Sequence, residues 1–340
     1  MRVDRTAGGA LYRRGSPAPA LVRATKPSLP PVQIYLPIAE LPVNMLLILG
    51  MGAAVGFLSG LLGVGGGFLL TPLLIFSGIP PAVSVASVTP QVVASSASAA
   101  LTYFRRRMID LKLVAVLTVA GMIGSAAGVL VFGMLRRIGQ LDLIVAISYV
   151  TFLSLVGALM LTESVRAIVR TRMGRPMPLR RPGQHIWVHR LPFKMRFKRS
   201  KLYISAVPVV VIGGAIGFLG AVLGIGGGFF LIPALIYLLR MPTNLVIGTS
   251  LAQIVATMAV ATVLHAYTNQ SVDIVLAVLL MIGGVVGAQF GVQAGQRIRG
   301  EQLRALMAIL VIVVAARFLY DLVTPPKEAF SLTTLAGSGL

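Results

Sequence analysis

Two glutamines are the first candidates for ligand binding, because they occupy matching positions in two hydrophobic segments. Gln91 follows "SVASVTP" and Gln253 follows "VIGTSLA". Amide and hydroxyl groups can donate hydrogen bonds to an oxyanion without placing a buried positive charge beside it. The alternative for each serine or threonine is a bond to its own helix or to a neighbouring helix. The hydroxyl residues near the glutamines are Ser87, Thr89, Ser95, Ser96, Thr249, Ser250 and Thr257.

Two glycine clusters occur in the most hydrophobic parts of the chain. They are "GLLGVGGGFLLTP" at 60–72 and "AVLGIGGGFFLIP" at 221–233, and their glycines and proline differ by 161 positions. Glycine is about 1 kcal/mol less favourable than alanine inside a helix, so each cluster predicts a helix break. A helix that restarts near Phe68 or Phe229 presents unpaired N–H groups at its positive end, which favours an anion.

Close helix packing is the alternative reading of these glycines. Other glycines recur every fourth residue, as in small-xxx-small helix contacts, and for these we predict packing. They are Gly52, Gly56, Gly60, Gly283, Gly287, Gly291 and Gly295. For the clusters we favour the broken helix. The predicted substrate site therefore consists of Gly65, Gly66, Gly67, Pro72, Thr89, Gln91, Gly226, Gly227, Gly228, Pro233, Thr249, Ser250 and Gln253.

The composition predicts an integral membrane protein. Hydrophobic residues make up 56% of the chain and charged residues only 11%, against about 25% charged in a typical soluble domain. The formal net charge is +21, but the basic residues lie in loops between apolar runs, as in cytoplasmic loops. We therefore expect no nucleic-acid partner. The absence of cysteine excludes disulfides and thiol chemistry.

Ten apolar runs divide the chain into two halves of five. The repeat extends beyond the glycine clusters, since Asp110 matches Asp273 and Gly121 matches Gly284. An odd number of segments per half implies that the second half enters the membrane inverted, as in many secondary transporters. We predict an all-α polytopic membrane protein with two inverted-topology repeats of about five transmembrane segments, whose helices break at the glycine-rich motifs. The expected parts are a disordered basic tail at 1–33, a first repeat at 34–163, a basic cytoplasmic loop at 164–201, a second repeat at 202–324 and a C-terminal tail at 325–340.

The distribution of charge predicts the orientation. If the first segment starts outside, twenty of the thirty Lys and Arg residues fall on the cytoplasmic side, twelve of them in the central loop. The six basic residues of the tail would then have to cross the membrane. An even number of segments in the first half, or a natural start nearer Val32, are the alternatives.

Few charged residues fall within the predicted segments. Asp110 and Asp273 open matching segments, where we expect each carboxylate to stabilise a helix N-terminus. We expect His265 to be a solvated histidine at a segment end, and Arg317 to extend toward the membrane interface. His185 and His189 lie in the basic loop without further ligands nearby, so no metal site is expected.

The doubled pattern is similar to that of a known family. "GFLSGLLGVGGGFLLTPLL" with "VASVTPQVVASSASA", followed by "GFLGAVLGIGGGFFLIPAL" with "IGTSLAQIVAT", resembles the sulfite exporter TauE/SafE family of bacterial membrane permeases. The resemblance covers residues 34 to 323. It implies a multi-pass carrier in the cell inner membrane for small sulfur-containing or organic anions such as sulfite, sulfonates or thiosulfate.

The predicted function is a secondary transporter of small anions that works by alternating access. We expect no enzymatic activity and no cofactor, because the segments hold no paired carboxylates, metal ligands or nucleophilic triad. An anion channel or a membrane scaffold remains the alternative, and a pump would need a separate ATPase, since no nucleotide loop is present. The expected partners are a small anionic substrate and the lipid bilayer. The sequence leaves open whether chains associate into a homo-oligomer.

Overall fold

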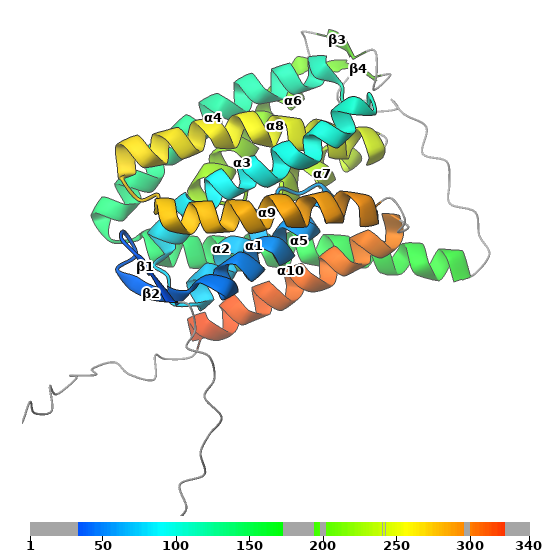
Figure 1. Cartoon of the computed structure of the whole chain (residues 1–340). Helices are drawn as coiled ribbons and strands as arrows, with labels where there is room; N and C mark the ends of the chain where they lie inside the picture. The colour runs from blue at the N-terminus through cyan, green and yellow to red at the C-terminus, as the bar shows by residue number, and fades with distance from the viewer. Residues whose placement is uncertain are drawn as a thin grey trace, which may run out of the picture. The chain divides into compact units, whose positions relative to one another are not determined.

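The computed structural model describes residues 33–172, 194–197, 202–239, 241, 243–295 and 300–323, all within one unit, Val32–Leu340. These residues form ten α-helices, one π-helical turn and two β-hairpins (Figure 1). The first half contains β1 (Gln33–Leu36), β2 (Leu41–Asn44), α1 (Met45–Leu62), α2 (Gly67–Phe76), α3 (Pro81–Arg105), α4 (Leu111–Ile138) and α5 (Leu141–Arg172). The second half contains β3 (Lys194–Phe197), β4 (Leu202–Ser205), α6 (Ala206–Leu223), α7 (Gly228–Tyr237), α8 (Thr243–Leu264), η2 (His265–Asn269), α9 (Ile274–Gly295) and α10 (Gly300–Val323).

The helices coincide with the ten predicted apolar runs, but three features differ at their edges. A short antiparallel hairpin precedes the first helix of each half, with Gln33 paired to Asn44 and Lys194 paired to Ser205. The segment expected to begin at 202 therefore starts as a strand. Helix α5 continues to Arg172, into the stretch expected to be a loop. The predicted tail at 1–32, most of the predicted basic loop and the stretch 324–340 lie outside the described residues.

Polar side chains set where several helices begin. Asn44 and Ser205, which end the two hairpins, accept hydrogen bonds from the first N–H groups of α1 and α6. Asp110 caps α4, and Asp273 accepts bonds of 3.1 Å from the N–H groups of Val275 and Leu276 at the start of α9. The predicted role of the two matching aspartates is thus confirmed.

The first helix of each half packs on the fourth helix of the other half. Along α1, Gly56 faces Gly284 and Gly60 faces Ala288, so that α1 and α9 run in the same direction with their backbones in contact. Helices α4 and α6 are joined in the same way, since Gly217 faces Gly121. The predicted packing role is confirmed for the glycines spaced at four residues, because a Cβ on any of them would meet the backbone of the partner helix.

The third helices of the two halves, and also the fifth helices, lie side by side in opposite directions. Thr262 of α8 contacts Thr89 of α3, while Leu251 packs beside Ala99 further along. In the α5–α10 pair, the rings of Tyr149 and Phe318 stack at 5.1 Å. Each pair therefore joins equivalent helices of the two halves, as Figure 1 shows for α5 and α10.

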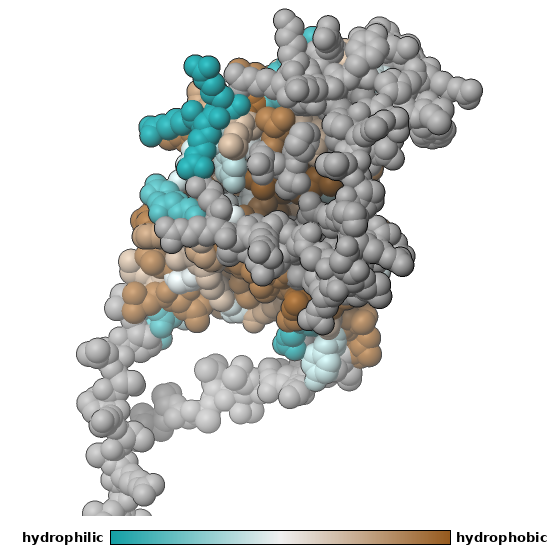
Figure 2. Space-filling view, turned by 90° about the vertical axis from the view of Figure 1, so that its right-hand side faces the viewer, coloured by the Kyte–Doolittle hydropathy of each residue, from teal (hydrophilic) through white to brown (hydrophobic). Residues whose placement is uncertain are grey.

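Hydrophobic side chains cover the outside of the helices. Val119 and Ile123 on α4 expose 61% and 69% of their surface, and hydrophobic residues dominate the described part of the face in Figure 2. Six of the described helices are long and apolar enough to cross a bilayer, and α2 is a shorter apolar helix. Apolar surface of this extent on long helices is stable in lipid rather than in water. The chain is therefore an all-α polytopic membrane protein.

The α1–α9 contact predicts opposite effects for two Gly→Ala substitutions. In Gly287→Ala the new Cβ would press on the Ala53 carbonyl and lie 2.8 Å from the Phe57 nitrogen, which should destabilise the protein by about 1–3 kcal/mol. Gly50→Ala is the control, because no atom lies within 4 Å of its Cβ and alanine favours the helix by about 1 kcal/mol. Thermal unfolding in detergent should give a lower Tm for Gly287→Ala only. Equal shifts in both variants would contradict a tight glycine contact.

Candidate functional site

Each glycine cluster lies between two helices. Helix α1 ends at Leu62 and α2 begins at Gly67, while α6 ends at Leu223 and α7 begins at Gly228. The residues before the second helices, Gly66 and Gly227, both have φ of 77°, a left-handed conformation in which a side chain is strained. We call residues 63–66 the first break and residues 224–227 the second break. Their glycines are required by the local backbone as well as by packing.

The two breaks lie against each other. A Cβ on Gly67 would be 2.9 Å from the carbonyl carbon of Ile225, and a Cβ on Gly228 would be 2.7 Å from that of Val64. The rings of Phe68 and Phe229 stack beside this contact, with centroids 5.0 Å apart and planes at 11°. Both breaks are buried. The starts of α2 and α7 are thus brought together from different halves of the chain.

The first turn of α2 leaves backbone donors near the break. Leu69 and Leu70 donate to the Gly66 carbonyl, and Gly67 donates to the Gly65 carbonyl at 3.0 Å. Within the part of the chain that the structure describes, the N–H groups of Gly65, Gly66 and Phe68 have no acceptor. Helix α2 has 10 residues, about 15 Å, which is half the thickness of the hydrocarbon layer. Unpaired donors at the start of such a helix suit an anion.

The two prolines of the predicted site lie inside the short helices. Pro72 is buried in α2 and Pro233 is half-buried in α7. Proline has no N–H, so it cannot donate to the carbonyl four residues earlier. That carbonyl belongs to Phe68 in α2 and to Phe229 in α7. The prolines therefore loosen the hydrogen bonding of both short helices near their starts.

The two predicted glutamines occupy equivalent positions but differ in their hydrogen bonds. Gln91 lies against Gly284 of α9, and both of its amide atoms are buried with no partner among the described residues. Gln253 lies against Gly121 of α4, and its Nε2 donates to the Thr257 hydroxyl at 2.8 Å. The Oε1 of Gln253 has no partner. A buried amide without hydrogen bonds is unfavourable, so both glutamines have unused capacity for a ligand, and Gln91 has more.

The three predicted hydroxyl residues have protein partners. Thr89 donates to the Ala86 carbonyl at 2.8 Å, within its own helix. Thr249 accepts a bond of 3.4 Å from the Asp110 N–H at the start of α4. Ser250 donates to the Ile247 carbonyl and lies 3.3 Å from the carbonyl of Gly63 in the first break. Of these three hydroxyls, only that of Ser250 contacts a break.

Two other serines lie beside the first break, and among the described residues their buried hydroxyls have no partner. They are Ser59 on α1 and Ser96 on α3. Ser96 was among the polar residues noted near Gln91, but Ser59 was not predicted because it stands among the packing glycines of α1. Comparing the two halves could have found it, since the equivalent position in the second half is Gly220.

His265 and Arg317, the two basic side chains considered at segment ends, both have contacts within the protein. His265 was expected to be solvated, and this prediction is wrong, because the residue is fully buried. Its Nε2 bonds to the Ala221 carbonyl at 3.0 Å, and the turn of η2 directs the ring inward. Arg317 is exposed, with its guanidinium 5.5 Å from the Phe76 ring centre and 5.6 Å from that of Tyr320.

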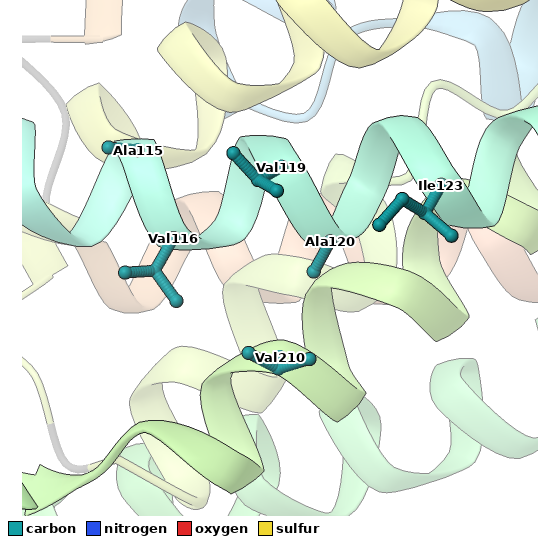
Figure 3. A pocket seen from close by; sticks show the side chains of 6 residues that line it. All are labelled: Ala115, Val116, Val119, Ala120, Ile123 and Val210. Carbon is teal, nitrogen blue, oxygen red and sulfur yellow. The ribbon is translucent and has the colours of Figure 1, made fainter. Parts of the chain in front are cut away.

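An open groove between α4 and α6 has a different character. Its volume is about 380 Å³, and five of its lining residues come from α4 and one from α6 (Figure 3). All six are aliphatic, so the groove offers no hydrogen-bond donor to an anion, and its chemistry suits acyl chains. The lining residues are Ala115, Val116, Val119, Ala120, Ile123 and Val210.

Comparison with known sequences agrees with this architecture. The profile of the family described as "Sulfite exporter TauE/SafE" matches residues 48–318. A "Probable membrane transporter protein YjnA" of Bacillus subtilis is 31% identical over 272 residues, which is 78% of this chain and 96% of that protein. A "Probable membrane transporter protein" of Xylella fastidiosa is 29% identical over 80% of this chain and 94% of its own length. No solved structure matches the chain.

A plant relative matches a shorter part of the chain. "Sulfite exporter TauE/SafE family protein 3" of Arabidopsis thaliana is 35% identical over 100 residues, which is 28% of this chain and 20% of that protein. The described helices define an all-α polytopic membrane protein. Because the family profile covers most of its length, the chain belongs to the sulfite exporter TauE/SafE family.

The unpaired amides lead to a prediction for Gln91→Leu and Gln253→Leu. A lost hydrogen bond to a charged ligand weakens affinity by about ten- to a hundredfold, so sulfite binding should fall most for Gln91→Leu, whose amide has no other partner. Removal of an unpaired buried amide should leave the Tm unchanged or raised. Calorimetric titration and thermal unfolding of the same purified variants measure both. A lower Tm with unchanged sulfite affinity would instead indicate a packing role.

Proposed function

We propose that the chain is a secondary transporter of small anions. The observation that carries this proposal is the meeting of two glycine breaks, each at the start of a short helix that contains proline. Non-helical backbone at membrane depth is tolerated where it is buried in protein or lines a watery cavity. Paired helix starts of this kind form the central sites of many transporters, where they face an anionic group.

The two halves insert in opposite orientations in this proposal. Support comes from α3 with α8 and from α5 with α10, because each of these pairs joins equivalent helices that run antiparallel. Helix α1 packs on α9, and α6 packs on α4, so the first helix of each half contacts the fourth helix of the other half. A two-fold axis between the halves relates these two contacts. Transport then proceeds by alternating access, in which the halves rock about the fixed central site.

The substrates proposed are sulfite, sulfonates or other small sulfur-containing or organic anions. Support comes from the family description and from the chemistry of the site, whose donors are backbone N–H, amide and hydroxyl groups. Such donors bind an oxyanion without fixing a permanent charge in the membrane, so the empty carrier can reorient at little electrostatic cost. The proposed location is the inner membrane of a bacterium, in agreement with the bacterial relatives named as transporters.

Transport of labelled sulfite tests the proposal. Proteoliposomes preloaded with unlabelled sulfite should take up external ³⁵S-sulfite with saturable kinetics, and faster than empty vesicles, because a carrier must reorient with its substrate. Vesicles without protein give the background rate. Uptake that rises linearly with external sulfite concentration and does not depend on internal sulfite would indicate a channel. Uptake at the background rate for every sulfur anion tested would indicate a scaffold.

The inverted orientation predicts which positions face the outside. Arg136 donates to the Asn269 carbonyl, so the end of α4 and the turn after α8 lie at the same end of the protein. Single cysteines at Gln140→Cys and Thr268→Cys should therefore react with an impermeant maleimide in spheroplasts. Gly174→Cys in the predicted cytoplasmic loop should react only after permeabilisation. Equal labelling of all three positions in intact spheroplasts would contradict the inverted arrangement.

A further inference from the structure

Among the described residues, two hydroxyls beside the first break have no hydrogen-bond partner. Ser59 lies beside Gly66, where a Cβ would be 3.1 Å from the Ser59 Cβ. Ser96 faces Gly65 from α3, where a Cβ would be 3.4 Å from the Ser96 Oγ. Both serines are fully buried, and neither hydroxyl has a hydrogen-bond partner. Two buried donors thus converge on one short stretch of backbone.

Their lack of partners contrasts with other hydroxyls on α3 and α8. A serine or threonine in a helix usually donates to the carbonyl three or four residues earlier. Ser95 does so to Val92, Thr89 to Ala86 and Thr262 to Met258. A buried hydroxyl that forgoes this bond is unfavourable unless another group accepts its proton. Within the described residues, Ser59 and Ser96 therefore keep their hydrogen-bonding capacity unused.

At the second break, the described residues place no unpaired hydroxyl at the equivalent positions. The repeat places Gly220 where the first half has Ser59, and Met258 where it has Ser96. A Cβ on Gly220 would be 2.9 Å from the Met258 methyl carbon and 3.4 Å from the Gly227 nitrogen. The methionine side chain thus reaches toward the space beside Gly220 that corresponds to the serine site.

At the second break, three carbonyls receive hydrogen bonds from side chains of other helices. Tyr149 donates to the Leu223 carbonyl at 2.7 Å, and His265 bonds to the Ala221 carbonyl. Thr71 lies 3.4 Å from the carbonyl of Gly224. These side chains satisfy the carbonyls at the end of α6 and just after it, which a helix otherwise leaves unpaired. Side chains from other helices therefore fix the backbone that enters the second break.

We infer that the protein binds one small oxyanion, and that it does so at the first break. The proposed donors are the N–H groups of Gly65, Gly66 and Phe68, the hydroxyls of Ser59 and Ser96, and the amide of Gln91, which lies on α3 with Ser96. Their number suits a compact anion with three or four oxygens, such as sulfite or sulfate. This inference rests on the proposed function and deepens it, because two nearly equivalent breaks are assigned unequal roles, with binding at the first and support at the second.

Titration of the purified full-length protein with sodium sulfite tests the assignment. The wild type should bind one anion per chain. The double variant Ser59→Ala with Ser96→Ala should bind at least tenfold more weakly, as expected for lost hydrogen bonds to a charged ligand. Its Tm should not fall, because both hydroxyls are unpaired in the free protein. Ser95→Ala is the matched control on α3, since its hydroxyl is already bonded to Val92, and it should bind as the wild type does.

A variant at the second break serves as the control for binding at the first break. Met258→Ala shortens the side chain beside that break and should leave sulfite affinity unchanged, whatever its effect on the Tm. Wild-type affinity in the double serine variant, or two anions bound per chain, would overturn the assignment and leave the proposed transport intact. A wild type that neither binds nor exchanges sulfite, sulfate, thiosulfate or sulfonates would contradict the proposed function itself.

Discussion

The structure depends on how backbone polar groups are satisfied in a medium that offers no water. Every helix interruption at membrane depth exposes N–H and C=O groups, and each one left unpaired in hydrocarbon is highly unfavourable. In this protein the two interruptions are buried against each other, so that Gly67 faces Ile225 and Gly228 faces Val64. Only glycine permits this approach, because any Cβ would occupy the space of the opposing carbonyl group. The remaining helices enclose and support this contact.

Side chains of each half form hydrogen bonds with the backbone of the other half. The hydroxyl of Ser250, in the second half, lies near the Gly63 carbonyl of the first break, and Thr71 of the first half lies near the Gly224 carbonyl of the second. The Asp110 N–H donates to Thr249, and the Asp273 N–H donates to Ser87 at 2.9 Å. These reciprocal bonds explain why several Ser and Thr residues of the hydrophobic segments have structural partners. What distinguishes Ser59 and Ser96 is that they take no part in this exchange.

Much of this architecture could be predicted from the sequence because it depends on local patterns. Apolar runs of membrane length located the helices, and the restart expected near Phe68 occurs at Gly67. The hairpins were missed because strands of four residues carry too little periodicity, and Pro42 weakens that signal further. The burial of His265 depends on a π-helical turn and on Ala221, which is 44 residues away. The unequal surroundings of the breaks depend on side chains from α1, α3, α6 and α8, which only the tertiary fold brings together.

The parallel α1–α9 contact also constrains biosynthesis. Gly52 on α1 packs against Leu280, which is made 228 residues later. At about 5–20 residues per second, the glycine face of α1 waits roughly 10–50 s for its partner after its own synthesis. During that interval its small residues face lipid or the insertion machinery. Neither half can form these contacts alone, because α1 and α4 both find their partners in the second half. A chain interrupted before α9 therefore exposes an unpaired glycine surface, a feature by which quality control could tell an unfinished protein from a finished one.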